Sequence, residues 1–200
     1  QGGWHTCGLC RHATWLAALA TVNWFAIPAR EPDDGRFTGI RVSSIWRHGA
    51  YIPNRNLHVL VSHFAPMICG VYTVPVSHCE VRGVFTHTAP VASLRGVARA
   101  EAVYVLERLV DAAARESNRD PVALRRLNLI GADSLPYTTP AGAKYDAVDF
   151  AANLDAALDA SKWDEFPQRR AESVARSRLR GRGLSTFVEM TGGAPTELAE

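Results

Sequence analysis

The segment from Thr86 to Glu101 constrains this chain most, because it joins three kinds of local structure just before a long helical pattern. It starts as an extended stretch around Pro90, passes through the pair Arg95-Gly96, and ends where a helix begins. The N-terminus of a helix presents backbone N–H groups that lack intrahelical partners, and a guanidinium is a planar donor that suits oxyanions. The segment therefore predicts a turn that can face an anionic group.

The surrounding sequence predicts a mixed succession of helices and strands. Apolar residues recur at helical spacing through 101–116, which predicts a helix with one buried stripe. Asp120 and Pro121 are a typical N-cap and first residue of another helix. Alternation and turn signals predict strands near 37–43 and 80–85, an irregular stretch over 59–76 with short helical or extended pieces, and a loop or hairpin over 137–142. They also predict a helix capped by Asp149, a helical stretch from Trp163 to about Arg178, and a final strand over 183–190.

Composition excludes several classes of protein. The chain has 200 residues, of which 47% are hydrophobic and 21% charged, values that are ordinary for a globular protein. A formal net charge of +2 gives no indication of nucleic acid or a membrane surface as a partner. The apolar run over residues 13–27 is short for a bilayer span. It predicts either the apolar part of a signal peptide or a buried helix.

The cysteines leave a different class of function open. Cys7 and Cys10 form a Cys-x-x-Cys pattern between His5 and His12, and zinc would accept these four ligands. Structural zinc sites normally gather ligands from two separated pairs, and this sequence has one. The alternatives are a small metal-binding interaction module, a redox pair, and free thiols in a reducing compartment. The other histidines have no spacing typical of a metal site.

Several motifs, in order along the chain, resemble the large subunits of molybdenum hydroxylases, the family of xanthine dehydrogenase, aldehyde oxidase and aerobic carbon monoxide dehydrogenase. Residues 86–101 are similar to the family segment T-N-T-x-P-x-x-A-Y-R-G-x-G-R-P-E. Residues 120–130 resemble its D-P-x-x-[LV]-R-x-x-N-x-I element. Further similarities lie at residues 33–37, 49–51, 102–111, 137–146 and 179–184.

The resemblance covers residues from about 33 to 200 and implies an α+β fold, as a fragment of the molybdopterin-binding domain of such a large subunit. Residues 33–130 would form the C-terminal part of the first molybdopterin-binding subdomain. Residues 131–200 would form linker helices and the start of the second. Residues 1–32 do not match the family, and a frameshifted, mis-assembled or decayed gene would explain them.

The resemblance also implies a reaction and a site. Members hydroxylate a carbon centre with oxygen from water, so the chain would belong to the catalytic subunit of an oxidoreductase acting on an aldehyde or an N-heterocycle. The molybdenum–molybdopterin cofactor, in its cytosine dinucleotide form, would be bound by Arg95 and Gly96, and Val97, Ala98 and Thr196 would line the substrate pocket. An iron–sulfur subunit and a subunit carrying FAD would be the partners, in a cytoplasmic dimer of heterotrimers without a membrane span or nucleic acid.

The chain departs from the family segment at several positions. His87 stands for the usual Asn, Leu94 for Tyr, Ala98 for Gly and Ala100 for Pro. Alanine has less backbone freedom than glycine, which implies a looser contact with the cofactor at Ala98. Gly96 occupies the place where carbon monoxide oxidisers have the cysteine that bridges copper and molybdenum, which argues against carbon monoxide as the substrate.

Two catalytic elements of the family have no counterpart in these 200 residues. The glycine-rich loop with its cofactor-contacting Gln is expected before Gln1, and the G-x-G-E segment with the catalytic Glu base is expected beyond Glu200. The resemblance therefore predicts no catalytic residue within the chain, and an inactive protein when the chain stands alone. A truncated or decayed, non-catalytic product is the alternative.

Overall fold

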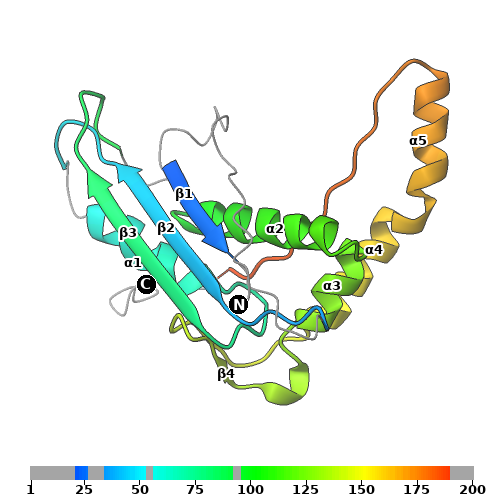
Figure 1. Cartoon of the computed structure of the whole chain (residues 1–200), viewed down its shortest axis with the longest axis horizontal. Coiled ribbons are helices and arrows are strands. Elements are labelled where there is room, and N and C mark those ends of the chain that lie inside the picture. Colours follow the sequence, from blue (N-terminus) through cyan, green and yellow to red (C-terminus); the bar gives the residue numbers. More distant parts are fainter. Residues whose placement is uncertain (1–20, 27–33, 53–55, 92–95, 190–200) are drawn as a thin grey trace, which may run out of the picture.

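The computed structural model describes residues 21–26, 34–52, 56–91 and 96–189. The main sheet has three strands. Figure 1 shows helices packed beside this sheet, and a helical arm that reaches away from it before an extended segment returns toward it. The α+β class implied by the sequence is confirmed. In the described part of the chain, no helix has both the length and the apolar character needed to cross a membrane.

The sheet consists of β1 (Thr21–Ala26), β2 (Ile40–Arg47) and β3 (Ser77–Val84), in that order. β1 pairs with β2 in antiparallel fashion, and β2 pairs with β3 in parallel fashion over the full length of both strands. Alternate residues of β2 are buried, as a half-buried strand requires. The two strands predicted from alternation are therefore present, although β2 begins later and ends later than predicted.

Helix α1 (Asn56–Met67) provides the crossover that a parallel strand pair needs. The sequence predicted only short helical or extended pieces in an irregular stretch over 59–76, and α1 is a longer, regular helix that ends at Met67. Pro66 lies inside the last turn of the helix, where a missing N–H removes only one bond near the helix end. The chain from residue 68 to residue 72 then leaves the helix, and all of it is buried.

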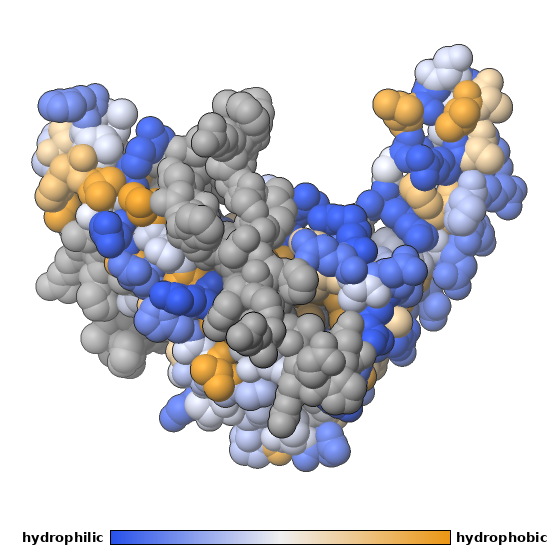
Figure 2. All heavy atoms as spheres, viewed as in Figure 1, coloured by the Kyte–Doolittle hydropathy of each residue, from blue (hydrophilic) through white to orange (hydrophobic). Residues whose placement is uncertain are grey.

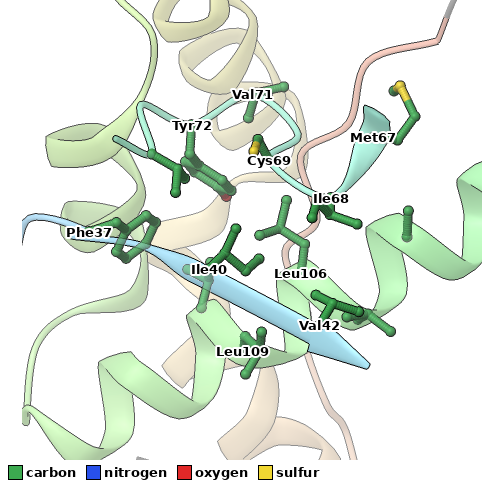
Figure 3. Packing of buried hydrophobic residues seen from close by; sticks show 14 of the residues in the cluster. Phe37, Ile40, Val42, Met67, Ile68, Cys69, Val71, Tyr72, Leu106 and Leu109 are labelled. Atoms are coloured by element: carbon green, nitrogen blue, oxygen red, sulfur yellow. The ribbon is translucent and has the colours of Figure 1, made fainter. Parts of the chain in front are cut away.

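The core lies between the sheet and the helices behind it. Figure 3 shows Ile40 and Val42 of β2 facing Leu106 and Leu109, with Ile68 above them. Each is at most 5% exposed. Full burial of an aliphatic side chain stabilises a fold by roughly 1.5–3 kcal/mol, so this cluster is the main source of stability for the part of the chain that carries the candidate site.

Helix α2 (Arg99–Glu116) supplies the largest share of the core and confirms the helix predicted over 101–116. The predicted stripe is buried or half-buried along its length. Its fully buried apolar members are Ala102, Val105, Leu106, Leu109 and Val110. Glu107 is buried on the same helix although it is charged, and no periodicity argument predicted this.

Helix α3 (Pro121–Asn128) confirms the predicted cap. The side chain of Asp120 accepts hydrogen bonds from the backbone N–H of Val122 at 2.9 Å and of Ala123 at 2.8 Å. At the other end, the amide of Asn128 donates to the carbonyl of Gly35 at 2.9 Å and accepts from the N–H of Phe37 at 2.7 Å. Asn128 thereby holds the chain that leads into β2 against α3.

The C-terminal half is more open. A short hairpin of β4 (Tyr137–Thr138) and β5 (Lys144–Tyr145) confirms the predicted turn region. Helix α4 (Phe150–Ser161) begins at Asp149, which accepts from Ala152 N–H at 2.9 Å as predicted. Short 3₁₀ turns span Ala132–Ser134 and Trp163–Glu165, and α5 (Phe166–Ala175) forms the end of the arm.

Two predictions near the ends of the chain need correction. The final strand over 183–190 does not form a ladder within the described residues; residues 183–189 are extended and lie on α2 and its neighbours. Side-chain contacts with a helix replace the strand neighbour that a ladder needs. The buried helix considered for residues 13–27 is wrong over Thr21–Ala26, which is β1. The remainder of that run, with Cys7 and Cys10, lies outside the described residues.

Candidate functional site

Residues 86–91 are extended and lead to the turn; we call them the approach. Backbone hydrogen bonds hold the approach at one end of the sheet. The N–H of Thr86 donates to Gly49 O at 2.9 Å, and the N–H of Ala50 donates to Thr88 O at 3.0 Å. Gly49 has φ +79°, and a Cβ on it would lie 2.3 Å from the carbonyl oxygen of Ala89. Only glycine can occupy this position without moving the approach. Residues 86–91 therefore run in one register toward the turn that follows.

His48 is 5% exposed, and its carbonyl accepts a hydrogen bond from the N–H of Val91 at 3.2 Å. Its Nε2 has no hydrogen-bond partner in the described part of the chain. Gly83 lies against the ring, because a Cβ there would be 2.4 Å from Nε2. Burial lowers the pKa of His48, so the imidazole is neutral at neutral pH. His48 is a packing residue that supports the approach.

The turn at the start of α2 has two residues in the left-handed backbone region. Gly96 has φ +83° and Ala98 has φ +63°. The N–H of Arg99 closes the turn onto the carbonyl of Gly96 at 3.1 Å. A Cβ on Gly96 would meet no atom of the described residues within 4 Å, so within that part of the chain this side of the turn has room for another group. A non-glycine residue in the left-handed region costs about 1–2 kcal/mol.

The structure places the predicted site residues unequally. Gly96 and Val97 are half-buried in the turn, while Ala98 is fully buried and belongs to the hydrophobic core. Any contact of Ala98 with a ligand would therefore come from its backbone. Arg95 and Thr196 lie outside the described residues, so their roles stay predictions.

Charged side chains follow the turn directly. Arg99 forms an ion pair with Glu189, which belongs to the extended chain near the C-terminus. Glu101 is 7% exposed, and its Oε2 has no hydrogen-bond partner among the described residues. Burial raises the pKa of Glu101, because it disfavours the charged carboxylate relative to the protonated form. The start of α2 thus carries one cation that is already paired and one acid without a complete set of partners.

A cluster of buried polar side chains lies further along α2, beyond its first turn. Arg125 Nη2 donates to Glu107 Oε2 at 2.8 Å and to Asp111 Oδ1 at 2.9 Å, and the Arg125 side chain is 0% exposed. Tyr72 donates to Glu107 Oε1 at 2.6 Å, and Thr186 donates to the same oxygen at 3.0 Å. Burial alone would lower the pKa of Arg125, but Glu107 raises it, so the guanidinium stays charged.

Sequence reasoning noted Arg125 and Asn128 only as members of a family motif, and it gave them no place in the structure. A signal was available, because an Arg and an Asn at i and i+3 on a short capped helix occupy one face. Glu107 gave the matching signal, as a charged residue inside the predicted apolar helix. Glu107 lies eight residues after Arg99 on α2, so the cluster is about 12 Å along the helix from its first residue.

Two cavities lie away from the turn, one along the C-terminal half of α2 and one between α3 and α4. One has a volume of about 430 Å³ and is lined by Arg115, Trp163 and Arg182 among others. The other has a volume of about 770 Å³ and lies between α3 and α4. Asp111, which also lines the first cavity, is 13 residues from Ala98 along α2, about 20 Å at the helical rise. These cavities are therefore separate from the turn.

The described residues contain no cluster of three or more His, Cys, Asp or Glu side chains that could hold a metal ion. The thiols of Cys69 and Cys79 are free. Burial raises the pKa of the Cys79 thiol to about 11, with a smaller contribution from Cys69. These thiols are therefore protonated and unreactive at neutral pH.

Apolar surface borders the approach. Tyr51, which follows β2, is 62% exposed, and Phe85, which follows β3, is 64% exposed. Figure 2 shows apolar residues gathered at this end of the sheet. Large exposed aromatic side chains at one end of a sheet are typical of a surface that another part of a protein covers.

Comparison with known proteins identifies the matching family. Residues 31–129 match a family described as the molybdopterin cofactor-binding domain. The carbon monoxide dehydrogenase large chain of Hydrogenophaga pseudoflava is 35% identical over 175 residues, which cover 84% of this chain and 21% of that protein. The nicotine 6-hydroxylase large subunit of Paenarthrobacter nicotinovorans is 30% identical over 161 residues, which cover 80% of this chain and 20% of that protein.

Solved structures agree. Quinoline 2-oxidoreductase from Pseudomonas putida 86 superposes with a TM-score of 0.68 at 29% identity, over 78% of this chain and 20% of that one. The chain therefore spans about a fifth of the length of the relatives that it matches. The matched family region contains the approach, the turn and the whole of α2.

Proposed function

The chain belongs to the family of molybdenum hydroxylase large subunits, through its molybdopterin cofactor-binding domain, and on that premise we propose that it forms part of the cofactor-binding, catalytic subunit of a hydroxylating oxidoreductase. The observation that carries the proposal is the turn at Gly96–Ala98. It lies in the matched domain, it uses two left-handed residues to begin a helix, and within the described part of the chain the side of Gly96 that a side chain would fill is open.

The residues of the turn fit such a group. Backbone N–H groups at a helix start favour anionic or acceptor atoms, and a glycine lets a ligand approach the backbone closely. Arg95 and Gly96 are the proposed cofactor contacts, and Val97, Ala98 and Thr196 the proposed borders of the substrate pocket. When bound, the molybdenum–molybdopterin group supplies the redox chemistry that hydroxylates a carbon centre with oxygen from water. The chain would position this group and set the electrostatic environment around it.

An N-heterocycle or an aldehyde is the proposed substrate. Two relatives support the first class, because nicotine and quinoline, after which they are named, are N-heterocycles. Carbon monoxide is disfavoured although one relative is named for it, because Gly96 offers no thiol for a second metal. The cytosine dinucleotide form of the cofactor, an iron–sulfur subunit, an FAD subunit, a dimer of heterotrimers and a cytoplasmic location complete the proposal. They rest on the resemblance to the family, as do the subdomain limits at residues 33, 130 and 131.

A chimaeric large subunit tests the proposal. Residues 34–189 would replace the matching segment of the quinoline 2-oxidoreductase large subunit, co-expressed with its own partner subunits. Molybdenum content by elemental analysis and pterin content by fluorescence after oxidation are then measured per assembled protein. We expect the chimaera to hold both, and to hold much less of both when it carries Gly96→Val.

Gly142→Val is the matched control. Gly142 also has a positive φ, of +92°, and a Cβ on it would likewise meet nothing within 4 Å, but it lies in the β4–β5 hairpin. Backbone strain is therefore equal in the two variants, and only position relative to the turn differs. An assembled chimaera without pterin, or equal loading in the two variants, would refute the proposed cofactor site.

A further inference from the structure

The extended chain from Leu184 to Glu189, which we name the strap, runs along α2 from its middle to its first turn. The carbonyl of Leu184 accepts from Arg125 Nη2 at 3.2 Å. Thr186 contacts Tyr72 OH at 2.8 Å as well as Glu107, and Glu189 pairs with Arg99. The strap is thus attached at three points, and each point is a polar contact with a different element or turn.

The distance between the last two attachment points is similar whether it is measured along the helix α2 or along the extended strap. Glu107 and Arg99 are eight residues apart on α2, which is a distance of about 12 Å along the helix axis at 1.5 Å per residue. From Thr186 to Glu189 the strap advances three residues, about 10 Å for an extended chain. The two lengths agree, so the strap lies nearly straight beside the helix and antiparallel to it.

Burial along the strap alternates as on a strand. Leu184, Thr186 and Val188 are half-buried, whereas Ser185 and Phe187 are exposed, and Val188 packs against the hydrophobic core. The middle attachment is the most rigid, because Arg125 and Glu107 are both almost inaccessible to water and hold each other through two hydrogen bonds. Charge-assisted bonds of this kind have well-defined geometry.

We propose that the strap is a positioning device for the Gly96–Ala98 turn: the buried Arg125–Glu107 pair fixes its middle, and the Glu189–Arg99 ion pair carries that fixed position to the first turn of α2. Arg99 and Glu189 are positioning residues, since they act on the turn and not on a ligand. The inference deepens the proposed function, on which it rests for the importance of the turn. It supplies a contact from outside the turn to a turn that has no side-chain cap and carries an alanine with positive φ.

Hydrogen–deuterium exchange of the 200-residue chain, read by peptide, tests the strap without any cofactor. Glu189→Gln removes the ion pair and keeps the size of the side chain. We expect amides of residues 96–102 to exchange about two- to fivefold faster, as the loss of a partly exposed ion pair allows, and amides of α4 to be unchanged. Glu80→Gln, which breaks the exposed pair with Arg82 on β3, is the matched control and should leave residues 96–102 unchanged.

Two further variants separate positioning from general loosening. The charge-swapped double variant Arg99→Glu, Glu189→Arg should restore wild-type exchange at residues 96–102. Thr186→Val removes the middle hydroxyl and should speed exchange both in the strap and at residues 96–102, whereas Ser185→Ala on the exposed side should affect neither. Unchanged exchange at residues 96–102 in Glu189→Gln, or a double variant as loose as the single one, would overturn the proposal.

The outcome is independent of the cofactor experiment. If the strap variants behave as expected and the chimaera holds no pterin, the proposed function fails and the strap stands. If the chimaera holds pterin and Glu189→Gln leaves exchange at residues 96–102 unchanged, the proposed role of the strap fails and the proposed function stands.

Discussion

Replacing Ala98 with glycine measures the strain that the site stores. Ala98 has φ +63°, and relief of a left-handed alanine should return about 1–2 kcal/mol. Two losses oppose this gain. The unfolded chain gains entropy worth about 0.4–1 kcal/mol, and the methyl group, which is 0% exposed, forfeits about 0.8 kcal/mol of burial. We therefore expect the stability of Ala98→Gly to lie within about 1 kcal/mol of the wild type.

Ala102→Gly is the control that isolates the strain. Ala102 is also 0% exposed, but it lies inside α2, where its N–H bonds to the carbonyl of Ala98. The same methyl is lost there, and glycine costs about 1 kcal/mol in a helix interior, so Ala102→Gly should be destabilised by about 2 kcal/mol. Urea unfolding followed by circular dichroism measures both variants. Equal destabilisation of the two, at equal m-values, would refute a left-handed Ala98.

Three more predictions concern the surroundings of the turn. Gly49→Ala should lower the free energy of unfolding by at least about 2 kcal/mol more than Gly142→Ala in urea titrations, because both positions have positive φ but only Gly49 is crowded. Glu101→Gln should be more stable than the wild type at pH 7. Burial raises the pKa of Glu101, so the stability contributed by its neutral form is lost as pH rises through that pKa, and thermal midpoints should converge below about pH 4. Arg125→Met should cost about 3–5 kcal/mol, because Glu107 is left as a buried charge without its partner; a loss under about 1 kcal/mol in urea would contradict the buried pair.

Elements with local signals were predictable from the sequence. The caps at Asp120 and Asp149 and the apolar stripe of α2 act within a few residues, and the structure confirms each of them. Strand β1 and the full length of helix α1 were missed because both depend on parts of the chain far away in sequence. β1 pairs with β2, and α1 connects the two parallel strands β2 and β3. Local propensity does not contain such information.

The candidate site stays a prediction, and only the backbone at two of its residues can be compared with the sequence. Gly96 and Ala98 were located by the resemblance, and a glycine in the family motif at position 98 already indicates a backbone that favours positive φ. The strap was missed because residues 183–190 have the alternation of a strand, and alternation does not say whether the buried side meets a sheet or a helix. The burial of Arg125 and Glu107 was missed because charged residues are buried only when paired, and their pairing spans two helices.

The contact between Tyr72 and Thr186 joins residues that are 114 positions apart in the chain, and this separation sets the order in which the protein can be completed during synthesis. Thr186 follows Glu116, the last residue of α2, by 70 residues. At about 5–20 residues per second, a ribosome needs about 4–14 s to make that stretch. During that interval the strands of the sheet, α1 and α2 have been made without the segment that contacts the hydroxyl of Tyr72 and Oε1 of Glu107. A nascent chain of this protein therefore exposes a half-made polar core for seconds, and a chaperone that recognises emerging chains has that time in which to act.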